Sequence, residues 1–218
     1  MTRTDIGFGA PSHQAISRGL LAWFPFDGTL QDVHGGHHAR VVVGTAGFGT
    51  DRGGKDQGAL VLAGATGLIF SDVEIKERSF TVQFWTLDPG QWILCQGIGE
   101  DFEGLHIGAN DSGLRCDYWG SNQIAPHAAH PGWTHWVMRH DIASGARTIW
   151  RDAFSAATMT SALYRGSGDF TLGRHFKGAG FYSGSLDDLA IWDRALTHPE
   201  IQRLYANGHG LTYVGTTD

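Results

Sequence analysis

Short runs of alternating apolar and polar residues, separated by turn residues, recur along most of the chain. In SFTVQFWTL, the apolar residues Phe80, Val82 and Phe84 fall on every second position, which is the alternation of a half-buried strand. Similar runs, bounded by Gly, Asp, Asn or Pro, predict strands within residues 19–27, 41–43, 59–62, 67–70, 91–97, 104–108, 113–119, 133–140, 147–152 and 169–174. This spacing predicts an all-β fold, an antiparallel β-sandwich of the jelly-roll kind.

One short helix is expected near the C-terminus. Thr197 and Glu200 form a T-x-x-E capping box, in which each side chain satisfies a backbone amide at the helix start. Leu196 and Ile201 flank the box as a hydrophobic staple. The Asn-Gly pair at 207–208 supplies a left-handed stop, so the pattern predicts a helix of about two turns between these signals.

The composition favours one domain with many tight turns. The 218 residues include 32 glycines and 8 tryptophans, and only 17% of them are charged. β-Sandwiches of this length are commonly undivided. We expect the sandwich to occupy residues 19–208, with an N-terminal extension at 1–18 and a C-terminal tail at 209–218.

Charge and hydropathy argue against nucleic acid and membrane as binding partners, and they leave the localisation unknown. The formal net charge is -6 and the 16 Lys and Arg residues are scattered, so no nucleic-acid partner is expected. No apolar run reaches the roughly 20 residues that a membrane span needs, so no membrane insertion is expected. Residues 1–18 lack the apolar region of a signal peptide, which leaves a cytosolic protein, export by another route, or a piece of a larger parent. The spacing of Cys95 and Cys116 requires neither a disulfide nor a metal, so two buried thiols are expected.

Three stretches resemble laminin G-like domains of the concanavalin A-like lectin/glucanase superfamily, which occur in many bacterial and phage surface proteins. They read AWFPFDGTLQDVHGGHHA, SFTVQFW and GSLDDLAIWDRALTHPEIQRLYANG, and with weaker echoes between them the resemblance covers residues 19–208. Two loops depart from the family pattern: residues 150–153 lack its Asp-Gly turn, and the loop after Asp27 is rich in histidine. The resemblance implies a module that binds glycans or proteins, often with one calcium ion and usually without enzymatic activity.

Several carboxylates become calcium candidates through this resemblance, because it places the first strand beside the penultimate strand. Calcium takes six to eight oxygen ligands, and glycine lets backbone carbonyls converge on it. The alternative is that Asp27 caps its own turn and Asp187 accepts backbone amides. The candidate ligands are Asp27, Asp32, Asp187 and Asp188, with carbonyls of the loop around His34 and Gly35.

The tryptophans fall into two groups, those expected in the core and those that are candidates for binding a ligand. The resemblance assigns core positions to Trp23, Trp85, Trp133 and Trp192, and Trp136 alternates with Met138 as an inward pair. The segment from Tyr118 to Asn122 is the best sugar platform, because flat rings and an amide match the apolar and hydroxyl surfaces of a pyranose. A partly buried strand end is the alternative. The candidate ligand-binding residues are Trp92, Tyr118, Trp119 and Asn122.

No catalytic motif stands out. The chain has neither the E-x-D-x-E strand of glucanases of this fold nor a G-x-S-x-G elbow. A jelly-roll polysaccharide lyase would rest on Tyr182 in HFKGAGFYSG and His127 in QIAPH. We therefore expect a non-catalytic carbohydrate- or protein-binding module, with a structural or assembly domain of a phage or surface particle, and last a lyase, as alternatives.

Overall fold

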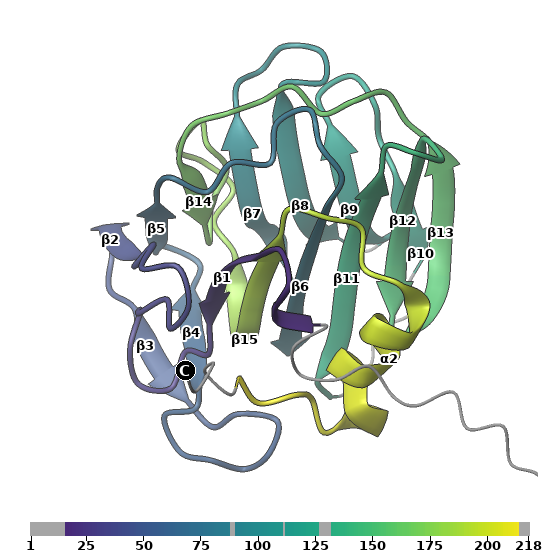
Figure 1. The fold of residues 1–218 in the computed structure, drawn as a ribbon. Helices are drawn as coiled ribbons and strands as arrows, with labels where there is room; N and C mark the ends of the chain where they lie inside the picture. Colours follow the sequence, from purple (N-terminus) through teal and green to yellow (C-terminus); the bar gives the residue numbers. More distant parts are fainter. Residues whose placement is uncertain (1–15, 88–89, 111, 127–131, 214–218) are drawn as a thin grey trace, which may run out of the picture.

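The computed structural model describes residues 16–87, 90–110, 112–126 and 132–213, and they form two antiparallel sheets packed face to face (Figure 1). In the first sheet the strand order is β13-β12-β11-β6-β15-β4-β3, with β1 paired to β15. In the second sheet the order is β10-β9-β8-β7-β14-β5-β2. The predicted β-sandwich is therefore confirmed.

The first sheet contains β1 (Leu20–Phe24), β3 (Gly47–Gly49), β4 (Ala59–Ala63), β6 (Phe80–Leu87), β11 (Thr134–Asp141), β12 (Ala146–Arg151), β13 (Phe154–Thr160) and β15 (Ser183–Trp192). The second sheet contains β2 (Arg40–Val43), β5 (Gly67–Phe70), β7 (Gln91–Gly97), β8 (Gly104–Asn110), β9 (Gly113–Tyr118), β10 (Ile124–Pro126) and β14 (Phe170–Leu172).

The main core lies between the sheets and follows the predicted alternation. Phe80, Val82 and Phe84 of β6 point into it, as do Trp136 and Met138 of β11. The intervening residues of β6 are buried as well, because a second apolar cluster covers the outer face of the first sheet. That cluster contains Ile16, Leu20, Trp23, Val137, Ala190, Trp192, Leu196, Ile201 and Leu204.

The short helix α2 (His198–Tyr205) contributes to this outer cluster and begins as predicted. The amide of Thr197 donates to Glu200 Oε2 at 2.7 Å, which closes the capping box, and Arg194 binds the same carboxylate at 2.7 Å. The helix ends one residue before the predicted stop, because Ala206 already has the left-handed conformation, with φ of 46°. Asn207 is left-handed too, with φ of 55°.

The resemblance placed the first strand beside the late strand that carries Asp187 and Asp188, and the structure bears this out, although that strand is the last one described and not the penultimate one. Trp23 pairs with Ala190 and Phe24 with Leu189, so β1 lies along β15 (Figure 1). Segments more than 160 residues apart in sequence thus lie side by side in one sheet. This adjacency brings the candidate calcium ligands into one region.

Some sequence predictions need correction. The sequence pattern predicted none of the short strands β3, β10 and β13. Trp133, expected in the core, is only partly buried. Cys95 and Cys116 are buried free thiols, as expected, and burial raises the pKa of the Cys116 thiol to about 12.

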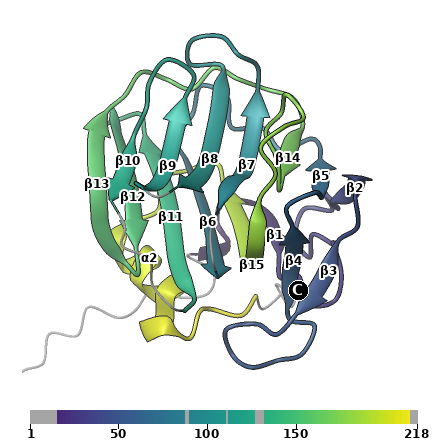
Figure 2. The same cartoon turned by 180° about the vertical axis from the view of Figure 1, so that it is seen from behind.

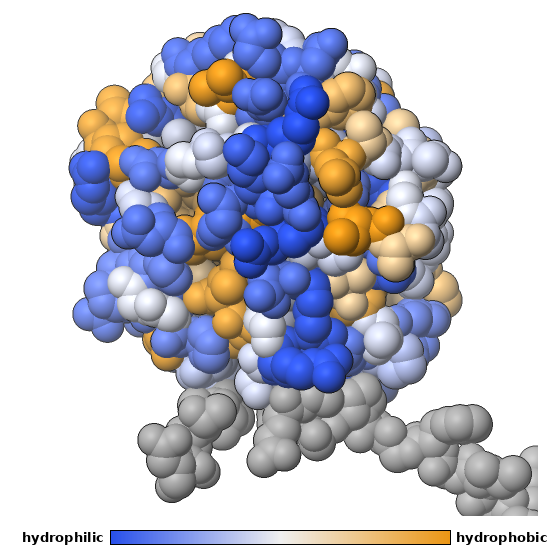
Figure 3. Space-filling model, turned by 45° about the horizontal axis from the view of Figure 1, so that its top comes forward, coloured by the Kyte–Doolittle hydropathy of each residue, from blue (hydrophilic) through white to orange (hydrophobic). Residues whose placement is uncertain are grey.

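Among the described residues no helix is long and apolar enough to cross a bilayer. The end of the sandwich at the top of Figure 1 carries mostly hydrophilic side chains, with hydrophobic ones in small separate groups (Figure 3). Scattered apolar residues of this kind are normal on protein surfaces and do not mark a docking face.

Candidate functional site

A cavity of about 270 Å³ lies on the outer face of the second sheet, over β7, β8 and β9. These three strands lie next to one another on the side seen in Figure 2. Period-two alternation creates the site: Ile107 and Cys116 point into the core, while the residues beside them point outward. The cavity is lined by Trp92, His106, Arg115, Asp117, Trp119, Gly120, Asn122 and His175.

Aromatic rings make up much of this lining, and His106 lies at their centre. Its ring centroid is 5.3 Å from that of Trp92 and 5.5 Å from that of Trp119. The ring of His175 stacks on it at 4.7 Å, and that of Phe176 at 5.0 Å. Flat rings gathered around a cavity are the surface on which sugars and other amphipathic rings stack.

Two polar groups of the cavity have spare hydrogen-bonding capacity. His106 is 5% exposed, yet its Nε2 has no hydrogen-bond partner among the described residues. The same holds for Nε of Arg115, whose Nη2 binds Asp117 at 2.7 Å and whose guanidinium carbon lies 5.6 Å from the Trp92 ring centroid. A buried polar atom without a partner costs about 1–3 kcal/mol, and because both atoms are inaccessible, a ligand would reach them only if the surrounding side chains moved.

Burial and neighbouring charges set the protonation of the site. Burial, with smaller contributions from His175, Arg115 and Lys177, lowers the pKa of His106 to about 4. The pKa of His175 is lowered by burial and by Lys177. Both imidazoles are therefore neutral at pH 7, when each has one donor and one acceptor nitrogen. Burial raises the pKa of Asp117, which Arg115 and the amide of Gln123 oppose.

A second cavity, of about 160 Å³, continues the first along the strands. It is lined by Gln91, Trp92, Gly108, Ala109, Asn110 and Arg115. A Cβ on Gly108 would lie 2.8 Å from Cε3 of Trp92, so glycine leaves the room that the indole occupies. Since the two cavities share Trp92 and Arg115, we treat them as one surface, the aromatic groove.

The structure brings together three of the four predicted sugar-binding residues. Trp92, Trp119 and Asn122 line the groove, although their ligand stays a prediction. Tyr118 does not: it is fully buried, and its hydroxyl is 2.7 Å from Nδ1 of His140. As the neighbour of outward-facing Asp117 on β9, it must point into the core, so its proposed role is corrected.

Sequence reasoning missed four polar residues of the larger cavity, namely His106, Arg115, Asp117 and His175. Arg115 and Asp117 could have been found, because they alternate with buried residues in GLRCDYW and share one face of that strand. His106 offered the weaker signal of one polar residue in GLHIG. His175 lies in the loop after β14, and nothing in its surroundings indicates that this loop reaches the groove.

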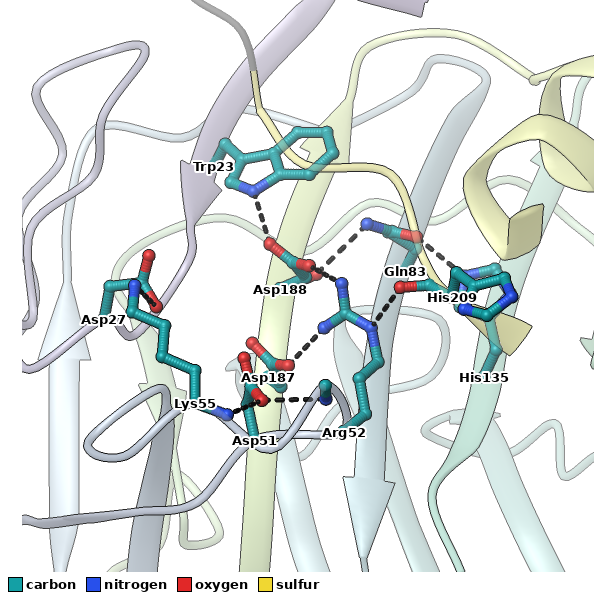
Figure 4. A network of polar contacts seen from close by, with 11 residues as sticks. Trp23, Asp27, Asp51, Arg52, Lys55, Gln83, His135, Asp187, Asp188 and His209 are labelled. Carbon is teal, nitrogen blue, oxygen red and sulfur yellow. Dashed lines mark hydrogen bonds and ion pairs between the residues drawn. The ribbon is translucent and has the colours of Figure 1, made fainter. Parts of the chain in front are cut away.

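In the region predicted to bind calcium, the aspartates bind an arginine side chain (Figure 4). A β-bulge in β15, where Asp188 has a φ of 47°, lets the consecutive residues Asp187 and Asp188 face the same cation. That cation is the guanidinium of Arg52, which binds Asp187 through Nη1 and Asp188 through Nη2, the latter at 2.6 Å. Its Nε donates to the carbonyl of His209 at 3.1 Å, and Trp23 Nε1 donates to Asp188 at 2.9 Å.

The remaining candidate ligands are also engaged. Asp32 accepts backbone amides of Trp23, His34, Gly35 and His37 at 2.8–3.0 Å, so it organises its own loop. Asp27 pairs with Lys55 at 2.7 Å. His34 and Gly35 thus contribute amides to Asp32.

These residues do not fit a calcium ion. Two cations, Arg52 and Lys55, already neutralise the carboxylates that would have to bind it. Across the described ranges, no three or more His, Cys, Asp or Glu residues gather as a metal site would require. The alternative in which Asp187 accepts backbone amides is not what the structure shows either, because its partner is a guanidinium.

The lyase candidate Tyr182 does not lie at the groove. It is fully buried in the core, where its hydroxyl donates to the carbonyl of Ser185 at 3.1 Å. The other candidate, His127, lies outside the described residues.

Comparison with known sequences gives a family match. Residues 62–202, more than half of the chain, match the sequence model of the concanavalin A-like lectin/glucanases superfamily. No curated protein matches the chain by sequence.

Solved structures with the same fold include binding domains. Domain 4 of AbnA, a GH43 extracellular arabinanase from Geobacillus stearothermophilus, in complex with arabinotriose, superposes with a TM-score of 0.68 at 18% identity, over 84% of this chain and 96% of that one. The binding domain of botulinum neurotoxin DC in complex with SialylT gives 0.67 at 16% identity, over 88% of this chain and 52% of that one. The binding domain of Paraclostridial Mosquitocidal Protein 1 gives 0.68 at 15%, over 88% and 53%. At these identities the likeness shows the fold alone.

Proposed function

Since the chain belongs to the concanavalin A-like lectin/glucanases superfamily, we propose that it is a carbohydrate-binding module whose ligand lies in the aromatic groove. The observation that carries the proposal is the cluster of rings around His106. Its imidazole lies between the rings of Trp92 and Trp119 in the lining of a cavity that also contains Arg115, Asp117 and Asn122. A pyranose offers both an apolar face for such rings and hydroxyls for such polar side chains.

The extent of the groove supports a chain of sugars as the ligand. Its two cavities adjoin at Trp92 and Arg115, so neighbouring sugar residues would lie on either side of this pair. Two of the solved structures of this fold support a carbohydrate, since their complexes contain arabinotriose and SialylT.

The groove supports binding without hydrolysis. Glycoside hydrolysis usually requires two carboxyl groups on either side of the bond that is cleaved. Asp117 is the one carboxylate among the residues that line the groove, and it is already paired with Arg115. We therefore infer that the module holds a carbohydrate in place and leaves it intact.

A glycan array followed by calorimetry tests this function. The purified chain should retain one class of glycan, and Trp92→Ala or Trp119→Ala should each weaken that binding at least about tenfold, which corresponds to 1.4 kcal/mol. Phe154→Ala is the matched control, because this ring is 78% exposed and belongs to β13 of the other sheet, outside the lining of the groove. A blank array, or equal affinity of all four proteins, would refute the proposal.

A further inference from the structure

An unpaired cation lies beside the aromatic groove although the whole chain is acidic. The protein has a formal net charge of -6. Within the lining, Arg115 and Asp117 are paired, so their charges balance. Lys177 lies outside the lining, at the Trp119 ring, and adds a positive charge there.

Lys177 has no acidic partner. Its Nζ lies 4.2 Å from the centroid of the Trp119 ring, and no carboxylate of the described residues forms an ion pair with it. Asp101 is close to Gly120 at the edge of the cavity, but it is not part of the lining. The ammonium group is therefore held beside a ring of the groove by the ring itself.

Arg115 is only partly used. One nitrogen, Nη2, binds Asp117 at 2.7 Å, while Nε is buried without an acceptor. The guanidinium also lies over Trp92, which keeps its plane in the wall shared by the two cavities. A planar guanidinium with free donors matches the two oxygens of a carboxylate.

The positive charges of Arg115 and Lys177 also act on the histidines of the groove, His106 and His175. Arg115 and Lys177 both lower the pKa of His106, in addition to burial, and Lys177 lowers that of His175. The imidazoles are therefore neutral hydrogen-bonding groups, while the arginine and the lysine are the fixed charges of the groove.

We propose that the ligand of the aromatic groove is an acidic carbohydrate, whose carboxylate binds Arg115 and Lys177 while its ring faces contact Trp92 and Trp119. The inference rests on the proposed function and narrows it to one class of sugar. Uronic acids and sialic acids share this chemistry, and they differ in where the carboxylate lies on the ring.

Matched pairs of ligands test the inference by calorimetry. One arm compares oligogalacturonate with its methyl ester, which removes the charge and keeps the ring stereochemistry. The other compares sialyllactose with lactose. In at least one arm the acid should bind the wild-type chain at least about tenfold more tightly than its neutral counterpart, and this difference should shrink in high salt.

Two variants test whether Lys177 and Arg115 cause the preference for an acidic ligand. Lys177 is exposed, so Lys177→Gln should fold normally, and it should lower the affinity for the acid more than the affinity for the neutral sugar, which removes most of the preference. Arg115→Gln should do the same if the fold persists by circular dichroism. Lys76→Gln, an exposed lysine elsewhere, is the control and should change nothing.

The outcomes separate the two proposals. If neutral sugars bind as tightly as acidic ones, or Lys177→Gln leaves the preference intact, the acidic class is refuted and carbohydrate binding stands. If no carbohydrate of either kind binds, the proposed function fails and the narrower inference fails with it.

Discussion

A single arginine joins three distant parts of the chain. Arg52 comes from the loop between β3 and β4, Asp187 and Asp188 from β15, and the carbonyl of His209 from the segment after α2 (Figure 4). Its guanidinium carbon also lies 4.9 Å from the Trp85 ring centroid. Burial raises the pKa of both carboxyl groups, which the guanidinium opposes, so one cation stabilises two acids in a poorly solvated place.

Arg52→Met should therefore destabilise the fold severely. Removing one partner of a buried ion pair leaves an uncompensated charge and typically costs about 3–5 kcal/mol. We expect urea denaturation to show a fall of this size in the free energy of unfolding. Lys55→Met is the control, because the Lys55–Asp27 pair is exposed and such pairs contribute about 0–1 kcal/mol. Equal losses in the two variants would contradict this role of Arg52.

Buried histidine should make the fold sensitive to acid. Burial lowers the pKa of His135 from 6.5 to about 3, with Arg52 adding to the effect, and its Nε2 is 2.7 Å from Oε1 of Gln83. The unfolded chain binds this proton more readily, so the stabilising contribution is complete above pH 6.5 and is lost as the pH falls from there toward 3.

His135→Gln should flatten that part of the pH profile. Wild-type stability, measured by urea denaturation between pH 7 and pH 4, should lose roughly 3 kcal/mol more than that of the variant, at 1.36 kcal/mol per pKa unit. His209→Gln, at an exposed position, should keep the wild-type slope. Parallel profiles for wild type and His135→Gln would show that this residue does not carry the proton linkage.

At the scale of elements, the alternation that predicted the strands could not show what covers them. In β6 the sequence pattern predicted one buried face, but Thr81 and Gln83 on the other face are buried too, under the outer cluster. The strand β13 was missed because its residues FSAATMT include few large apolar side chains, and β3 because it lies among glycines. Their pairing with the neighbouring strands β12 and β4, and not a side-chain pattern of their own, forms these strands.

The helix α2 is the element whose local signals were sufficient. Glu200 accepts the amide of Thr197 and binds Arg194, so one carboxylate completes the cap and links the helix to the end of β15. Glu200→Ala should lower the free energy of unfolding by about 1–2 kcal/mol, as loss of a helix cap does. Gln202→Ala lies on the exposed side of the same helix and should cost less than about 0.5 kcal/mol. Chemical denaturation compares the two, and equal costs would show that the cap is dispensable.

At the scale of the whole molecule, the candidate site could be predicted only in part. Trp92, Trp119 and Asn122 stood out as aromatic and amide residues without a core position. Their common location depends on the strand order β9-β8-β7-β14, which also brings in His106 and His175. Strand order arises from contacts across the entire chain, so local patterns did not contain it. The same reason hid Arg52, which reaches the predicted calcium ligands from a loop that is far away in sequence.

The fold should consequently be indifferent to calcium while Arg52 is present. A ligand raises the unfolding temperature only when it binds the folded state, and Asp187 and Asp188 are already occupied by the guanidinium. Adding millimolar calcium or EDTA to the wild type should shift the unfolding temperature by less than about 1 °C.

In Arg52→Ala the two carboxylates lose their cation and share a cavity with Asp27 and Asp51, so calcium should recover part of the lost stability. Magnesium is the control, since it demands stricter octahedral geometry and dehydrates reluctantly. A calcium-dependent rise in the wild type that EDTA reverses would mean that the metal competes successfully with Arg52, and it would overturn this account of the β1–β15 edge.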